Sequence, residues 1–169
     1  MSERLRCSNC GNADFEPRRI NYDVGPLLGM TEVLVENYPA LVCPKCKAVS
    51  HVGEVLNEVE MTLAAFILQK GTIDQMEVRY LRKLLGYTQD EFAQKLGVER
   101  ITVSRWENSE APVSGPQALA LRSYAFFKLW GKSRRIDALV GTFLEPNVPP
   151  KGKRGGYKLM GSDLRAAAR

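Results

Sequence analysis

The sequence of 169 residues lacks long apolar runs and recognisable groups of catalytic residues. Its longest uninterrupted apolar stretch, Leu63 to Leu68, is far shorter than the roughly 20 residues that cross a bilayer. Met1 to Arg6 has no apolar signal-peptide core, and no combination of nucleophile and base suggests an enzyme. We therefore expect a cytoplasmic protein that is neither membrane-bound nor an enzyme.

Cysteine and histidine are also scarce, with four cysteines and one histidine. Every cysteine belongs to one of two CxxC pairs, in which a tight turn can present both sulfurs to a single metal ion. Four thiolates satisfy the tetrahedral preference of Zn²⁺ and leave no open position for a catalytic water. The sequence therefore predicts one structural zinc ion, bound by Cys7, Cys10, Cys43 and Cys46.

Other uses of these cysteines fit the sequence less well. A thioredoxin-like site needs a single CxxC at the start of a long helix, whereas both pairs here lie among turn-forming residues. Structural disulfides are disfavoured in the cytosol. Gly11, directly after the first pair, is expected to adopt a positive φ in the turn. His51 is interpreted as a surface or hydrogen-bonded side chain rather than a ligand.

Positive charge is concentrated towards the C-terminus. The whole chain carries a net charge of +5, and residues 131–169 hold nine Lys or Arg against three Asp or Glu. Such an excess favours a polyanionic partner, because phosphate contacts release counterions.

The periodicity of apolar residues predicts an α+β protein. Short β-prone runs indicate a small N-terminal sheet, and a following stripe of apolar residues indicates an amphipathic helix packed on it. Strands are expected at 18–24 and 31–35, and helices at 53–70, 74–85, 89–96, 100–107, 117–130 and 136–144. The implied domains are a zinc-binding domain over 1–70, an all-α helix-turn-helix domain of about five helices over 71–130, and a basic extension over 131–169.

A helix-turn-helix fits the stretch from Gln89 to Asn108. Two of its positions are restrictive: Ala93 is small where two helices cross, and Gly97 supplies the turn between them. Thr88 is expected to cap the first helix, with Glu91 completing a capping box. The buried apolar positions of the motif are Phe92, Leu96, Val98, Val103 and Trp106.

The second helix of the motif presents polar residues outward from its N-terminal half, which is the part that reaches base edges. We expect Arg105 to contact guanine and Ile101 to pack on a thymine methyl group, unless Arg105 pairs internally with Glu107 or Glu110. The remaining members of the interface would make base-edge or phosphate contacts. The full expected set is Thr88, Gln89, Arg100, Ile101, Thr102, Arg105 and Asn108.

The segments 87–98 (YTQDEFAQKLGV) and 103–108 (VSRWEN) resemble the Xre/Cro family of helix-turn-helix domains. The two CxxC pairs, joined by a helix to such a domain, resemble the YgiT-type zinc-finger proteins, which include the MqsA-like antitoxins. Together the resemblances cover roughly residues 1–130. In the best-known member an Asn precedes the reading Arg by four residues; here Ile101 takes that place, so a different operator is expected.

The resemblance implies an antitoxin of a toxin–antitoxin pair. Its zinc domain would inhibit a ribonuclease toxin, and its helix-turn-helix domain would dimerise and repress transcription at a palindromic operator. The alternative is an Xre-family regulator with a structural zinc domain and no toxin. A homodimer would use the helix at 117–130, where Phe126, Phe127 and Trp130 are either an interface or the domain's own core. Three roles are considered for residues 131–169: an accessory DNA clamp, a second partner site and a solvated tail.

Overall fold

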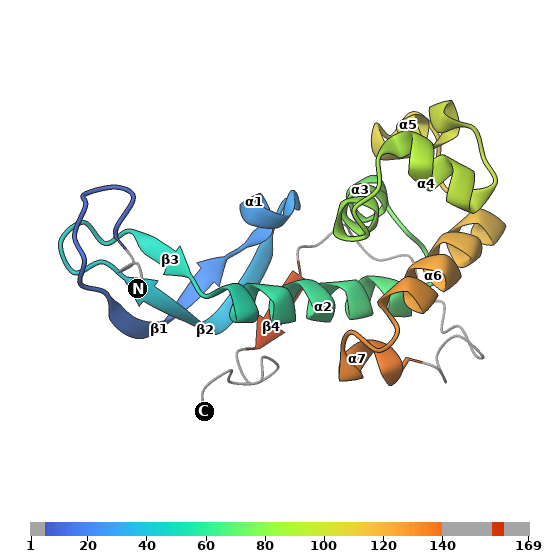
Figure 1. Ribbon diagram of the computed structural model, residues 1–169. Helices are drawn as coiled ribbons and strands as arrows, with labels where there is room; N and C mark the ends of the chain where they lie inside the picture. The colour runs from blue at the N-terminus through green and yellow to red at the C-terminus, as the bar shows by residue number, and fades with distance from the viewer. Residues whose placement is uncertain (1–5, 140–156, 161–169) are drawn as a thin grey trace.

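The computed structural model describes residues 6–139 and 157–160. Its N-terminal part is a small sheet with β2 (Val33–Val42) between β1 (Glu16–Asp23) and β3 (Val49–His51), both antiparallel to it (Figure 1). A single turn of helix, α1 (Gly25–Leu28), joins β1 to β2. The predicted α+β class is confirmed, although β2 continues well beyond residue 35, where its expected strand ended.

A bulge at Asn37 explains why β2 was predicted too short. Asn37 has a φ of 55°, and its backbone N–H donates to the Asn21 side chain across the strand pair. The register between β1 and β2 shifts there. Val33 and Val35 are buried before the bulge, and Tyr38, Ala40 and Val42 after it, so the alternation changes phase. A search for one unbroken period of two therefore stops at the bulge.

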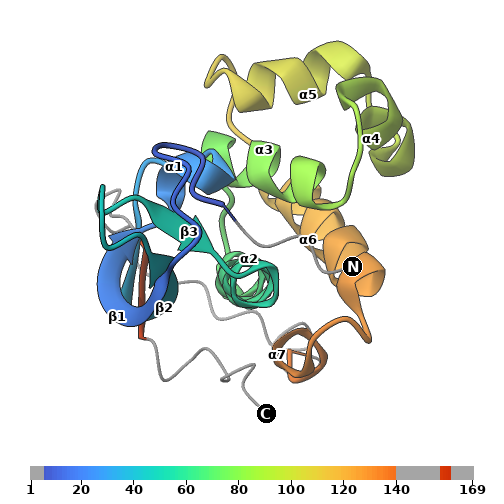
Figure 2. The ribbon, with the colours of Figure 1, turned by 60° about the vertical axis from the view of Figure 1, so that its left-hand side comes forward.

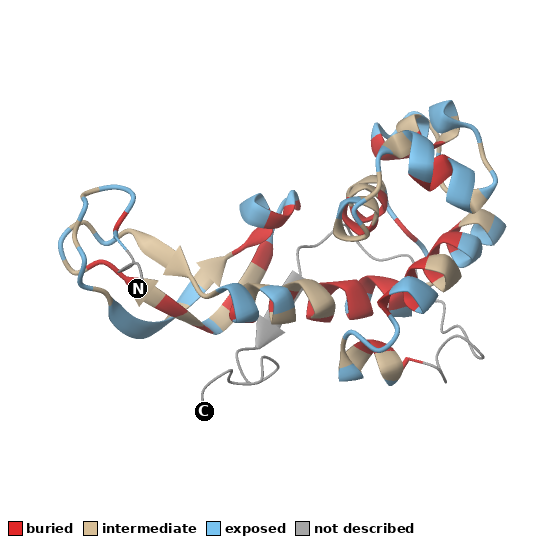
Figure 3. Ribbon diagram, in the orientation of Figure 1, coloured by how far each residue is buried: buried red, intermediate tan, exposed pale blue. Residues whose placement is uncertain are grey.

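Helix α2 (Gly53–Gln69) runs from the sheet to the other helices and confirms the helix expected at 53–70 (Figure 1). Its first turns bury one stripe, whereas its second half is buried on almost every side except at Phe66 and Gln69 (Figure 3). Helices α3, α6 and α7 contact α2, with α7 on the side away from the sheet (Figure 2). The longest apolar run of the sequence, 63–68, is thus the most enclosed part of the helix.

Four helices lie between residues 71 and 130, one fewer than the roughly five expected, and each is at a position that the sequence predicted: α3 (Gln75–Leu84), α4 (Gln89–Leu96), α5 (Arg100–Glu107) and α6 (Gly115–Leu129). Thr88 caps α4 in a capping box with Glu91, as expected, and Asp74 caps α3 in the same way with Glu77. Ser114 caps α6 in the same way, with Gln117 completing the box. Helix α6 therefore begins two residues before the expected Gln117, because the capping box places the N-cap at Ser114.

Buried charged side chains connect α2 to the other helices. Arg122 on α6 donates through its guanidinium to the Leu68 carbonyl in the last turn of α2. The fully buried Glu77 on α3 pairs with Lys70, which is the C-cap of α2. Lys70 has an extended backbone, so α2 ends without a left-handed C-cap. The Leu68 carbonyl accepts from Arg122 on α6 instead, and the Ile67 carbonyl accepts from the Lys70 N–H.

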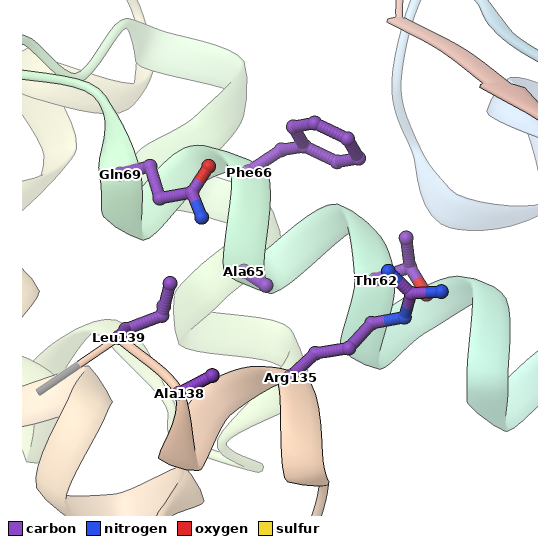
Figure 4. A pocket seen from close by; sticks show the side chains of 7 residues that line it. All are labelled: Thr62, Ala65, Phe66, Gln69, Arg135, Ala138 and Leu139. Atoms are coloured by element: carbon purple, nitrogen blue, oxygen red, sulfur yellow. The ribbon is translucent and has the colours of Figure 1, made fainter. Parts of the chain in front are cut away.

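Two elements from the predicted basic extension lie against the rest of the fold. Helix α7 (Arg134–Asp137) is shorter than the helix expected at 136–144, of which residues 140–144 lie outside the described residues. Between α7 and α2 there is an open pocket whose lining includes Phe66 and Arg135 (Figure 4). Strand β4 (Tyr157–Met160), which the sequence analysis did not predict, pairs in parallel with β2. Within the described ranges, no helix has the length and apolar character needed to span a bilayer.

Candidate metal centre and nucleic-acid interface

The four cysteine sulfurs form one compact cluster at the end of the sheet. All four sulfurs lie within 4.8 Å of one another. The Sγ atoms of Cys7 and Cys46 are 3.5 Å apart, and those of Cys10 and Cys43 are 3.6 Å apart. A disulfide would bring two sulfurs to about 2.0 Å. Four sulfurs at about 2.3 Å from one tetrahedral ion would be about 3.8 Å apart, close to what is observed. The cluster therefore fits a four-thiolate metal site, as the CxxC spacing predicted.

The two cysteine turns have the same backbone design. The Cys7 carbonyl accepts from the Gly11 N–H, and the Cys43 carbonyl accepts from the Lys47 N–H, each at 2.8–2.9 Å. Gly11 has a φ of 72°, which confirms the expectation for this glycine. Lys47 occupies the equivalent place with a φ of 61°, in a conformation that the sequence does not indicate for lysine. Each pair is thus closed by a left-handed residue directly after its second cysteine.

Backbone amides lower the pKa of both Cys43 and Cys10, whereas the neighbouring thiols lower the pKa of Cys43 and raise that of Cys10. The backbone N–H of Cys46, helped by that of Lys45, lowers the pKa of the Cys43 thiol to about 6 against the effect of burial. The Asn12 backbone lowers the pKa of Cys10, but burial and the other three thiols outweigh it and raise that pKa to about 12. Sulfurs this close repel one another as thiolates, and a divalent cation between them removes that repulsion. The donor set therefore suits a cation.

His51 lies apart from the cysteine cluster and is engaged elsewhere. Its Nδ1 is 3.1 Å from the Tyr38 hydroxyl, and its ring lies against those of Tyr22 and Tyr38. Partial burial lowers the pKa of His51 below its ordinary value. This is the hydrogen-bonded side chain that the sequence analysis favoured over a ligand.

Helices α4 and α5 form the helix-turn-helix, with the expected residues inside. Phe92, Ala93, Val103 and Trp106 are buried, while Leu96 and Val98 pack at the margin of the core. Gly97 is the left-handed C-cap of α4 with a φ of 67°. A Cβ atom at Gly97 would meet nothing within 4 Å, so the turn needs glycine for its backbone conformation and not for space.

The outward face of α5 is open to solvent. Arg100, Ile101 and Arg105 are exposed, and Thr102 is half-buried. Arg100 pairs with Asp90 at 3.4 Å, an exposed contact of little strength. Within the described parts of the chain, Arg105 has no ion pair, and Glu107 is engaged with other residues. The internal pairing considered for Arg105 is therefore not seen there.

Glu107, at the end of α5, is the centre of a buried polar network. Its carboxylate accepts from Arg82 at 2.6 and 3.1 Å and from Gln89 at 2.9 Å, and Arg79 lies 3.6 Å away. Burial alone would raise the pKa of Glu107, but Arg82, Gln89 and Arg79 outweigh it and lower that pKa. Because these partners come from α3 and α4, the network fixes α5 relative to both helices.

Three residues expected to contact phosphate or bases make intramolecular contacts. Gln89 donates to Glu107, and Asn108 accepts from Arg79 and donates to Ser104. Thr88 caps α4, and its hydroxyl donates to Glu91. Thr88 and Asn108 are exposed, whereas Gln89 is half-buried. The structure thus gives Gln89 a positioning role within the helix-turn-helix that sequence reasoning did not identify.

The aromatic residues of α6 divide between core and surface. Phe126 is buried, whereas Phe127 is 73% exposed and Trp130 is 49% exposed. Leu119 on the same helix is 47% exposed. The sequence left these aromatics open between core and interface, and the structure places only Phe126 in the core.

Comparison with known proteins agrees with the local geometry. Residues 78–124 match the family model described as helix-turn-helix, which covers α4, α5 and most of α3 and α6. Comparison with curated proteins finds no match. The chain therefore contains a helix-turn-helix domain, and this supports a DNA-binding regulator of the Xre type.

Proposed function

We propose that the protein is a sequence-specific transcriptional repressor that reads the major groove of double-stranded DNA with α5. The observation that carries this proposal is the solvent-open face of Arg100, Ile101 and Arg105 on a helix held from behind by the Glu107 network. A recognition helix must project from the fold yet keep a fixed orientation, because each base contact depends on its geometry. The basic residues also favour approach to phosphate.

The cysteine cluster is proposed to hold one Zn²⁺ in a structural role. Cys7, Cys10, Cys43 and Cys46 would fill all four positions of a tetrahedral ion, so no coordination site would be left for a substrate. Residues 1–70 would form this zinc-binding domain, residues 71–130 the DNA-binding domain, and 131–169 an extension.

Replacing Arg105 with alanine is expected to remove sequence preference while leaving weak, salt-sensitive binding. A bidentate arginine–guanine contact discriminates between bases by about 1–3 kcal/mol, which is roughly a 5- to 150-fold change in relative affinity. The operator is first recovered by selecting bound DNA from a random pool. Dissociation constants for that site and for a scrambled duplex are then compared at several salt concentrations.

Lys45→Ala is the matched control, because it removes an exposed positive charge on the cysteine turn, outside the helix-turn-helix. This variant should keep the ratio of specific to non-specific affinity. If Arg105→Ala also kept that ratio, the assignment of Arg105 as a base-reading residue would be wrong.

The repressor is proposed to act as a homodimer at a palindromic operator. One recognition helix reads only a few base pairs, and two half-sites about 34 Å apart double the contacts. Leu119, Phe127 and Trp130 give α6 an exposed apolar surface that a second copy could cover.

Phe127→Ser is expected to weaken self-association by at least tenfold, since burying an aromatic side chain stabilises an interface by about 1.5–3 kcal/mol. Sedimentation equilibrium of the free protein measures the dissociation constant. Leu27→Ser is the matched control, because Leu27 is an exposed apolar residue on α1. A wild-type protein that stays monomeric at high concentration would contradict the proposed interface.

The YgiT-type resemblance leads us to propose that the zinc-bound sheet also binds a protein, with a ribonuclease toxin as the partner. The runner-up is a regulator that has the same DNA-binding activity and no toxin. An adjacent gene for a small ribonuclease-like protein, whose product co-purifies with this chain, would select the antitoxin. A solitary gene with no such product would select the regulator.

A further inference from the structure

The inner strand β2 has one edge that two separate segments share. Along its other edge, β1 pairs with it from Leu34 to Val42. On the shared edge, β3 is only three residues long and pairs with residues 40–42. The stretch Val33–Glu36 would be left without a strand there, were it not for β4. The short β3 therefore creates a gap in the sheet that an extended segment can fill.

The segment that fills the gap comes from the far end of the chain. Tyr157 to Met160 pairs in parallel with Val33 to Glu36, one residue opposite one. In the register, Tyr157 and Leu159 lie opposite Val33 and Val35, the two fully buried residues of this part of β2. The strand joins a well-packed part of the sheet through main-chain pairing along four residues.

Main-chain pairing of this kind tolerates many sequences. An open strand edge offers N–H and C=O groups to any extended polypeptide, and alternate side chains then add specificity. A segment of four residues makes few such contacts and is held largely by its covalent connection to the chain. Covalent tethering typically supplies an effective concentration on the order of 1 mM. At that concentration, a strand with a dissociation constant of about 0.1 mM would occupy the edge about nine-tenths of the time.

We propose that the Val33–Glu36 edge is a docking site for an extended segment of a partner protein, and that β4 is its displaceable intramolecular occupant. The partner segment would add to β2 as a parallel strand, with apolar residues at alternate positions opposite Val33 and Val35. Its binding and the docking of β4 exclude each other. The inference refines the proposed protein-binding role of the sheet and rests on it for the existence of a partner, but not on DNA binding.

The test uses a fluorescent peptide with the sequence of residues 155–162 (GGYKLMGS) as the probe. A chain ending at residue 154 should bind this peptide, measured by fluorescence anisotropy, at least tenfold more tightly than the full chain. Hydrogen exchange should show faster exchange in residues 33–36 after truncation, and protection should return when the peptide is added. Where the truncated chain does not fold, the full chain carrying both Lys158→Pro and Leu159→Pro takes its place.

Proline in the peptide distinguishes strand pairing from non-specific adhesion. Neighbouring amides of a strand point in opposite directions, so either Lys158→Pro or Leu159→Pro must remove an N–H that faces β2. One of these two peptides should therefore lose binding, and a scrambled peptide should not bind.

Failure of the truncated chain to bind the native peptide, with unchanged exchange in residues 33–36, would overturn the proposal. So would a dimer that is lost on truncation, because the strand would then belong to a second copy. DNA binding by the same samples tests the proposed repressor separately.

Discussion

Cys43→Ser is expected to abolish metal binding and to unfold the two cysteine turns while the helices remain folded. Structural zinc contributes about 10–16 kcal/mol of apparent binding free energy in zinc-finger peptides, and that free energy is coupled to folding. Around the cluster, the structure offers little else to hold the turns: Cys7 and Cys43 are buried, but most residues between Ser8 and Phe15 are exposed or half-buried. Loss of one thiolate should therefore release both turns.

The rest of the molecule has its own core and should survive this change. Val33, Val35 and Ala40 of β2 and Val59 of α2 belong to one apolar cluster that continues into the helix-turn-helix. Intact-mass spectrometry under native conditions should give one Zn²⁺ per wild-type chain and none for the variant. Hydrogen exchange should become fast at residues 6–15 and 43–49 and stay slow in α3 to α6.

Ser8→Ala is the matched control, since Ser8 is exposed in the same turn and supplies no thiolate. It should retain the metal. Wild-type protein that binds no zinc yet keeps both turns protected would contradict the proposed metal centre, as would a pair of disulfides found in protein purified under reducing conditions.

Glu107→Ala is expected to destabilise the helix-turn-helix by about 3–5 kcal/mol, the cost typical of breaking a buried ion pair on one side. The carboxylate is 2% exposed, and the Arg82 side chain that pairs with it is 13% exposed. Removal of Glu107 leaves that guanidinium poorly hydrated and unpaired, and it also frees Gln89 and Arg79. Urea denaturation followed by tryptophan fluorescence measures the change in the free energy of unfolding. Trp106, next to Glu107 in the sequence, is buried and becomes exposed to water when the domain unfolds.

Asp90→Asn provides the control, because the ion pair of Asp90 with Arg100 is more than half exposed and should contribute no more than about 1 kcal/mol.

The dependence of stability on pH gives a second test of the Glu107 network. The pKa of Glu107 is lowered on folding from its ordinary 4.5, so its contribution is complete above that pH and is lost as the pH falls through the lower value. The stability gap between wild type and Glu107→Gln should therefore narrow below pH 4.5. Equal stabilities of wild type and Glu107→Ala at neutral pH would disprove the role of the network.

Local patterns in the sequence predicted the parts of the fold that local physics determines. The clustering of Cys7 with Cys43 was predicted from the geometry of the cysteine turns. The capping role of Thr88 and the turn at Gly97 were predicted from the requirements of helix ends. Phe92 and Trp106 followed from helical periodicity and lie in the core, and the exposed face of α5 followed from the same period. Each of these inferences depended on residues within a few positions of one another.

Contacts between distant residues could not be found in this way. Glu107 was considered only as a partner of Arg105, two residues away, because nothing local shows that Arg82 and Gln89 converge on it. Strand β4 was missed for a similar reason: its four residues form a strand only because β2 has an edge to offer them. Lys47 likewise adopts a positive φ because the second cysteine turn requires it, and not through any preference of lysine.

The position of α2 has a practical consequence for dissecting the molecule. Its second half is covered by helices that follow it in the chain, and Arg122 reaches back to the Leu68 carbonyl. A fragment cut after Lys70 would bare Leu63, Ile67 and Leu68 to water. Such a fragment should aggregate unless those side chains are replaced by polar ones. The sheet with its cysteine cluster and the helical part are therefore best studied in one piece, with point substitutions in place of excision.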